Sequence, residues 1–582
     1  MVTLALLAGV TAFAKPKPMK ERTIIYQVMT RLFGADGKEK QEWGSARQNG
    51  CGKMDDFTMK ALQSIRQLGC THIWYTGIIE HATQADYSAN GIRRDHPAVV
   101  KGKAGSPYAI KDYYDVDPDL ARDVPNRMKE FDNLVRRTHR AGLKMIIDFV
   151  PNHVARQYHS DAKPAGVRDL GEDDNVNIDF NSNNNFYYIG NQQFLPSFSL
   201  RDSVTGTDYV EMPARATGND CFTPSPGQND WYETVKLNYG VDYVGGHVPH
   251  FDPVPDTWHK MLHILQFWAG KGVDAFRCDM AEMVPCQFWG WAIPQVKSQH
   301  PGVQFIAEVY NPAEYRNYIH EGHFDYLYDK VGLYDTLRTV VADNSATAIT
   351  GCWQAVDDIN DHMLNFLENH DEQRLASPFF AGKAERGRAP LLVSALMRTN
   401  PFMLYFGQEL GERGMDKEGF SGEDGRTTIF DYWTVPTVAR WRDKGRFDDR
   451  LLTAEERDLR QFYAKVLTLC NEETALREGQ FFDVMYANQD NAMMNTHRQY
   501  AFLRKAEREL VLVVANFDER GARTAVRIPA HAFDYLQLPP EKRSYIAKDL
   551  LTNEASELTL EPDGLVQLIL PPLGGKVLKI KF

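Results

Sequence analysis

Four short apolar segments that each end in reactive side chains constrain the fold of this 582-residue chain more than any other feature. An apolar run that stops at charged or imidazole groups is typical of a buried strand with reactive residues at its carboxyl end. Three of the four segments end in a carboxylate. The pattern therefore predicts a parallel sheet that gathers carboxylates at one edge. The segments are 148–153 (DFVPNH), 272–279 (GVDAFRCD), 305–308 (FIAE) and 366–371 (FLENHD).

The spacing of these segments predicts a (β/α)8 TIM barrel, an α/β fold. Asp279 and Glu308 are about 30 residues apart, the length of one βα unit, and Glu308 and Asp371 are about two units apart. Repeated strand-helix alternation indicates a parallel sheet that is open or closed into a barrel. Further strands are expected at 24–29, 71–75, 143–150, 324–327 and 401–405, and helices at 56–68, 125–141 and 454–471.

The distance from Asp148 to Asp279 is too long for one βα unit, so about 90–100 residues must be inserted after the third strand. The excess is rich in Asn, Asp, Gly, Ser and Pro, and it predicts a loop-rich subdomain over the carboxyl ends of the barrel strands. After residue 478, short β-type runs without helices predict an all-β sandwich. The expected domains are the barrel (22–153 and 247–477), the inserted subdomain (154–246) and the C-terminal sandwich (478–582).

The remaining sequence features concern the location of the protein and the partners it can bind. The small, apolar residues 1–14 resemble a secretory signal peptide, so 1–21 is expected to be a signal and N-terminal extension of a secreted or periplasmic protein. If that segment is no signal, the protein is cytoplasmic. No later apolar run reaches the roughly 20 residues of a membrane span. A net charge of −12 disfavours nucleic acid as a partner, and seven scattered cysteines show no zinc signature but leave one or two disulfides open.

Carboxylates at strand ends suit glycoside hydrolysis. That reaction uses two carboxyl groups, one to attack or stabilise the anomeric carbon and one to protonate the departing oxygen. Arg277 lies two residues before Asp279, so both side chains face the same side of the strand. We expect the guanidinium to keep Asp279 ionised. Asp148 is expected to bond Arg277 rather than to react.

The four segments resemble, in order, the four signature regions of the α-amylase family of glycoside hydrolases, family 13, and the resemblance extends from about residue 22 to the end. It implies that Asp279 is the nucleophile, Glu308 the general acid/base and Asp371 the transition-state stabiliser. Residues 236–238 (KLN) are similar to a fifth region in the neopullulanase and cyclomaltodextrinase branch. The substrate-binding residues implied are Tyr108, His153, Arg277, His370 and Arg374.

The resemblance also raises the question of calcium. Asn152 matches a calcium-binding asparagine of the family, while Glu282 and Met283 replace the Lys-His pair that follows the nucleophile in many members. The acidic run 172–175 with Asp179 offers the oxygen ligands that calcium prefers, although a solvated loop has the same composition. A structural calcium ion is therefore left open, and no organic cofactor is expected.

The resulting prediction is retaining hydrolysis of α-1,4-glucosidic bonds in starch-type glucans or maltodextrins. It requires the carboxyls of Asp279 and Glu308 to lie about 5–6 Å apart. Trp231 and Trp433, in expected loops, are candidates to line sugar subsites. The alternatives are a transglycosylase with the same residues and a non-catalytic glycan-binding barrel. The preferred glucan, endo or exo action and the oligomeric state are left open.

Overall fold

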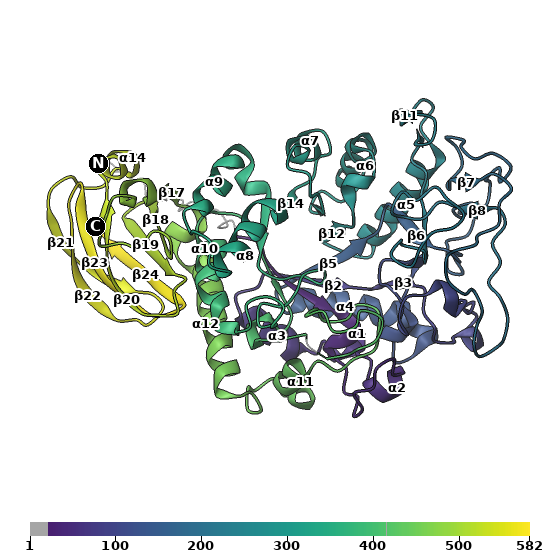
Figure 1. The fold of residues 1–582 in the computed structure, drawn as a ribbon, viewed down its shortest axis with the longest axis horizontal. Coiled ribbons are helices and arrows are strands. Elements are labelled where there is room, and N and C mark those ends of the chain that lie inside the picture. The colour runs from purple at the N-terminus through teal and green to yellow at the C-terminus, as the bar shows by residue number, and fades with distance from the viewer. Residues whose placement is uncertain (1–20, 415) are drawn as a thin grey trace, which may run out of the picture.

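Eight parallel strands close into a barrel in the computed structural model, which describes residues 21–414 and 416–582 (Figure 1). This closed barrel confirms the predicted fold. The expected signal segment lies outside the described residues, so export stays a prediction. In chain order, which is also the order around the barrel, the strands are β1 (Ile24–Met29), β2 (His72–Thr76), β5 (Lys144–Phe149), β12 (Ala275–Cys278), β13 (Gln304–Ala307), β14 (Tyr326–Tyr328), β15 (Met363–Phe366) and β16 (Phe402–Tyr405).

Helices connect successive barrel strands, and side-chain caps set where two of them begin. The Thr58 hydroxyl accepts a bond from the amide of Ala61, so the first long helix begins at residue 59. Thr453 and Glu456 form a reciprocal capping box before the last helix of the barrel. The helices of this layer are α3 (Met59–Gln67), α4 (Arg127–Arg140), α5 (Asp256–Gly270), α6 (Cys286–Gln299), α7 (Tyr315–His320), α8 (Asp335–Val341), α9 (Ala348–Ala355), α10 (Arg388–Leu396) and α12 (Ala454–Glu472).

The inside of the barrel is filled by side chains from all eight strands. Because side chains alternate along a strand, residues two apart point to the same face. Ala275 lies in the interior cluster, so Arg277 also faces inward, whereas Cys278 packs into the outer core. All seven cysteines are free, so no disulfide forms. The interior cluster comprises Ile25, Trp74, Ile146, Ala275, Ile306, Tyr328, Tyr334, Leu364, Phe366 and Met403.

The segment between β5 and β12 is mostly loop, with only short antiparallel strand pairs before α5. One pair anchors it to the barrel: β6 (His153–Ala155) pairs with β9 (Thr234–Lys236) directly after the third barrel strand. The hairpin of β10 (Val241–Asp242) and β11 (Val248–Pro249) crosses the boundary expected at 246. The remaining pair is β7 (Tyr188–Ile189) with β8 (Ala214–Arg215). A further hairpin, β3 (Ile79–His81) with β4 (Ile110–Val116), follows β2 and was not predicted.

The C-terminal region consists of two antiparallel sheets and lies on the side of the barrel away from the inserted segment (Figure 1). This confirms the all-β prediction. The larger sheet has the order β17-β18-β19-β24-β21-β22, and β20 pairs with β23. None of the described helices is long and apolar enough to cross a membrane. The strands are β17 (Gln480–Asp483), β18 (Gln499–Ala506), β19 (Glu509–Asn516), β20 (Ala522–Ile528), β21 (Arg543–Asp549), β22 (Ala555–Leu560), β23 (Gly564–Leu570) and β24 (Gly574–Lys581).

Candidate active site

Arg277 is the centre of a buried ion-pair network at the carboxyl ends of the barrel strands. One terminal nitrogen, Nη1, lies 2.7 Å from Asp279 and 3.4 Å from Asp148. The other, Nη2, lies 2.6 Å from Glu308, and Nε donates to the Tyr328 hydroxyl at 3.1 Å. The guanidinium is fully buried, and the planar fork fixes both carboxylates geometrically. Two of the carboxylates expected to react are thus held by one cation.

Two further donors fix the orientation of Glu308. The backbone amide of Met280 donates to Oε2 at 2.8 Å, and the Tyr310 hydroxyl donates to Oε1. Met280 has a positive φ of 42°, in the left-handed region that non-glycine residues seldom adopt. This turn directly after the nucleophile candidate aims the amide at Glu308. The sequence analysis missed Tyr310. Its position two residues after Glu308 could have suggested it, because residues two apart on an extended segment face the same side.

His370 connects the third carboxylate to the floor of the cleft. Its Nε2 lies 2.6 Å from the Tyr108 hydroxyl and 3.2 Å from Asp371, and its Nδ1 bonds the Gln27 amide at 2.8 Å. The Tyr108 ring stacks on the imidazole with centroids 5.1 Å apart. The Gln27 contact was not predicted. Gln27, which lies on β1, fixes the orientation of the His370 ring by binding Nδ1. Only the Nε2 edge of the ring is then available to contact a ligand.

These side chains line one cleft of about 650 Å³, large enough for a short sugar chain. The predicted residues Asp279, Glu308, Asp371, Tyr108, His153 and His370 all border it. Trp231 also lines the cleft, 5.3 Å from the His153 ring between centroids, whereas Trp433 is buried in the core. Cleft residues that were not predicted include Lys101, Glu233, Tyr310, Lys330, Glu372 and Arg426.

Burial dominates the electrostatics of this site. It raises the pKa of Asp279 well above its ordinary value, and the nearby charge of Arg277 opposes the shift without cancelling it. Burial also raises the pKa of Asp148 to about 6, again against Arg277. Burial lowers the pKa of His153 to about 3 and lowers that of His370, so both rings are neutral near pH 7. Burial thus opposes the ionisation of Asp279 that its ion pair with Arg277 favours, so the expectation that Arg277 keeps Asp279 ionised stays a prediction.

Two of the predicted substrate-binding residues do not reach the cleft. Arg374 is fully buried, and its guanidinium donates to Glu368 at 2.9 Å, the Thr427 hydroxyl at 2.9 Å and the Phe406 carbonyl at 3.0 Å. A guanidinium with three internal acceptors is not available to bind sugar, so that prediction is wrong. Arg277 is buried, does not line the cleft, and holds the carboxylates that do. Arg426 is the arginine that borders the cleft.

The surroundings of Asn152 do not fit a calcium ion. Its side-chain oxygen accepts a bond from the Lys236 ammonium at 2.8 Å, and its amide donates to the Gly218 carbonyl at 2.8 Å. Lys236 is buried and also pairs with Asp220 at 2.5 Å. An ammonium group thus occupies the place of a cation beside Asn152. The acidic run 172–175 does not converge on one point either, because Asp173 pairs with Arg168 and Asp174 accepts from the amides of residues 185 and 186.

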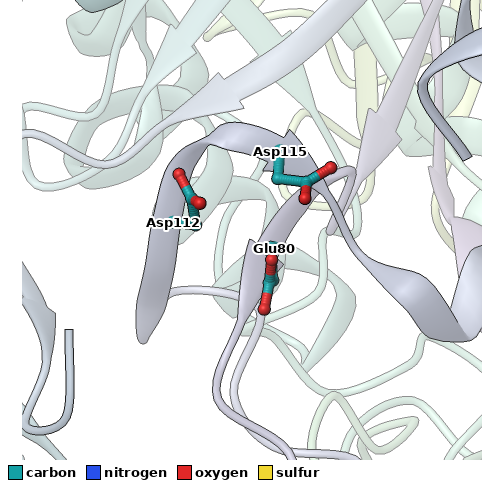
Figure 2. A group of neighbouring side chains, drawn as sticks. All are labelled: Glu80, Asp112 and Asp115. Atoms are coloured by element: carbon teal, nitrogen blue, oxygen red, sulfur yellow. The ribbon is translucent and has the colours of Figure 1, made fainter. Parts of the chain in front are cut away.

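A separate group of three buried carboxylates, Glu80, Asp112 and Asp115, lies on the β3–β4 hairpin (Figure 2). One oxygen from each lies within 4.8 Å of the others. Arg127 pairs with Asp115, and the Lys111 ammonium lies 4.0 Å from Glu80. Burial raises the pKa of Glu80 to about 9 even with Lys111 beside it. At neutral pH this carboxyl is therefore protonated, and Lys111 pairs more closely with Asp95, at 3.0 Å.

This protonation state predicts the effect of Glu80→Gln. Between the ordinary pKa of 4.5 and the folded-state value of about 9, the folded protein holds a proton that the unfolded chain lacks. Stability therefore falls as pH rises through that interval. The neutral amide removes this dependence, so the variant should be more stable by about 1–3 kcal/mol at pH 7 and by less at pH 5. Urea unfolding at both pH values measures this. Lower stability at pH 7, together with loss of a calcium-dependent melting shift, would instead identify a cation site.

The chain is similar in sequence and in structure to known proteins. A family model described as alpha amylase, catalytic domain, matches residues 35–450. Alpha-amylase 3 of Dictyoglomus thermophilum is 24% identical over 440 residues, which cover 71% of this chain and 74% of that protein. Neopullulanase 2 of Thermoactinomyces vulgaris is 20% identical over 589 residues, which cover 97% and 79%.

Solved structures share the fold. The alpha-amylase from Geobacillus thermoleovorans, crystallised with acarbose, matches with a TM-score of 0.61 at 18% identity, covering 97% of this chain and 100% of the other. The family model spans more than half of the chain and includes the carboxylate cluster and seven of the eight barrel strands, β1 lying before its start. The chain therefore belongs to the alpha-amylase family and is a glycoside hydrolase.

Proposed function

We propose that the cleft performs retaining hydrolysis of α-1,4-glucosidic bonds, with Asp279 as nucleophile and Glu308 as general acid/base. The observation that carries this proposal is the bridge made by Arg277, whose two terminal nitrogens bind Asp279 at 2.7 Å and Glu308 at 2.6 Å. One guanidinium that holds both carboxyls favours the short separation of a retaining pair over the wider separation of an inverting pair, which must leave room for a water molecule. The arrangement supports retention.

The reaction then proceeds in two steps, formation and hydrolysis of a covalent glycosyl-enzyme. A carboxylate oxygen of Asp279 forms a bond to the anomeric carbon while the glycosidic C–O bond breaks, and the proton of Glu308 moves to the departing oxygen. Water next attacks the anomeric carbon as Glu308 takes its proton, and the bond to Asp279 breaks. Asp371, which lies beside His370, would stabilise the positive charge that develops on the sugar ring in the transition state of each step.

The substrate class rests on the cleft and on the relatives. Neutral imidazoles at His153 and His370, with Tyr108 and Trp231, give hydrogen bonds and ring faces that suit an uncharged sugar. Proteins named alpha-amylase and neopullulanase align with most of the chain. Both support an α-glucan with 1,4-links. A transglycosylase with the same residues is the second candidate, because cyclomaltodextrin glucanotransferase of Bacillus licheniformis is also similar, at 22% identity over 373 residues.

Product lengths from maltoheptaose test both candidates. We expect wild-type protein to release only shorter maltodextrins, separated by chromatography over a time course, with the α-anomer formed first. Oligosaccharides longer than seven units in the early products would favour transglycosylation. No cleavage of maltoheptaose, soluble starch or β-cyclodextrin would contradict the proposed function.

A further inference from the structure

A second cavity lies at the opposite end of the barrel from the cleft. Its volume is about 850 Å³, larger than that of the cleft. Barrel residues that line it, such as Arg22 and Tyr326, stand at the amino ends of their strands, whereas the carboxylates of the cleft follow the carboxyl ends. The other wall comes from the C-terminal region, with lining residues on β17 and on α14 (Ala530–Leu536). The catalytic carboxylates take no part in this cavity.

Aromatic rings form much of the wall. Trp353 of α9 and Phe481 of β17 meet edge to face with centroids 5.1 Å apart. On the C-terminal region, Tyr486 and Tyr535 flank His531, and each tyrosine is 52% exposed. Side chains of this size are normally buried, because an aromatic ring buries a large apolar area. Phe482 and His531 contact both tyrosine rings, and the half of each ring that stays exposed is available to a ligand at the cavity.

The polar groups of the cavity favour an uncharged ligand and offer no catalytic pair. Four arginines and five acidic residues line it, so the charges nearly balance. The carboxylates already have internal partners: Arg398 binds Asp357 at 2.7 Å, and Asp483 accepts from Trp353 at 2.9 Å and from Tyr500 at 2.7 Å. Such fixed donors and acceptors can hydrogen-bond hydroxyl groups but cannot act as a free acid and base.

From this combination we propose that the cavity is a second, non-catalytic binding site for an α-glucan chain. Sugar rings would pack on Tyr486 and Tyr535, and the Arg398–Asp357 pair at the mouth would bind hydroxyl groups. The choice of glucan rests on the proposed function. Binding at this end would hold a polymer to the enzyme while another part of it enters the cleft, which raises the local concentration of substrate.

The test uses the double variant Tyr486→Ala/Tyr535→Ala. Both rings are half-exposed, so their loss should leave the fold intact, and melting temperature checks this. Migration in native gels that contain amylopectin measures affinity, with Asp279→Asn present in every sample to prevent cleavage. The double variant should bind roughly tenfold more weakly than its parent. In the active background its kcat/KM on maltotriose, too short to reach both sites, should stay within about twofold of wild type.

Ile569→Ala is the matched control, since Ile569 is 64% exposed on β23 and does not line the cavity. It should bind amylopectin as the parent does. Equal affinity of the double variant and its parent would overturn the second site. If the wild type cleaves no α-glucan but the parent still binds amylopectin through the tyrosines, the proposed reaction fails while this inference stands.

Discussion

Asp279→Asn should lower the rate of maltodextrin hydrolysis by about 10⁴-fold or more, because an amide is a poor nucleophile and cannot form the glycosyl ester. The side chain is buried and bound to Arg277 at 2.7 Å, and the amide has the same shape. The variant should therefore fold and still bind substrate. Initial rates of reducing-sugar release from maltoheptaose measure the loss.

Glu282→Gln provides the control for the Asn variant. Glu282 lies three residues further on, and its carboxylate accepts the Asn311 amide at 3.0 Å outside the ion-pair network. We expect its rate to stay within a few fold of wild type. A turnover of Asp279→Asn close to that of wild type would remove Asp279 from the reaction, whatever the behaviour of the control.

Arg277→Met should affect both stability and activity. It leaves Asp148, Asp279 and Glu308 buried without their shared cation, which costs about 3–5 kcal/mol in unfolding free energy at pH 7. Without that cation the pKa of Asp279 rises further, so the acid limb of kcat/KM should move to higher pH. Because burial raises the pKa of Asp148 and of Asp279, these two carboxyls take up protons as the pH falls, so the stability deficit should shrink toward pH 5.

Arg374→Met separates these two effects. Arg374 is as deeply buried as Arg277 but pairs with one carboxylate, Glu368, away from the cleft. The control should lose stability and keep the pH profile of wild type. Urea unfolding and pH–rate curves on a short maltodextrin measure both variants. An unshifted acid limb in Arg277→Met would show that the guanidinium does not set the charge of the reacting carboxyls.

Much of the fold could be predicted because the periodicity is local. The strand 24–29 and the helix 454–471 were placed to within one residue, since an almost wholly apolar run is readable in sequence and the Thr453–Glu456 capping box starts the helix where it was expected. The β3–β4 hairpin was missed because Ile79–His81 is only three residues long. The strand β18 is harder to recognise in sequence than its partner β19, because Gln499–Ala506 carries charged residues among its apolar ones.

Some residues of the site could be predicted from the sequence and others could not. Asp279, Glu308 and Asp371 could be found because each stands at a strand end, where a barrel brings distant residues together. Arg374 was assigned wrongly, since its neighbour His370 borders the cleft while its own side chain turns back to Glu368. The Lys236 ammonium beside Asn152 could not be foreseen, because 84 residues separate the two and only the folded inserted segment joins them. Long-range side-chain pairs of this kind are set by packing rather than by local sequence.

Trapping the covalent intermediate tests the central claim most directly. A fluorinated α-glucosyl fluoride slows formation and breakdown of a glycosyl-enzyme, and Glu308→Gln should slow its hydrolysis further. Mass spectrometry of the protein, followed by peptide mapping, should find one sugar attached to Asp279. An adduct on a different carboxylate, or no adduct together with β-anomeric product, would contradict a retaining mechanism through Asp279.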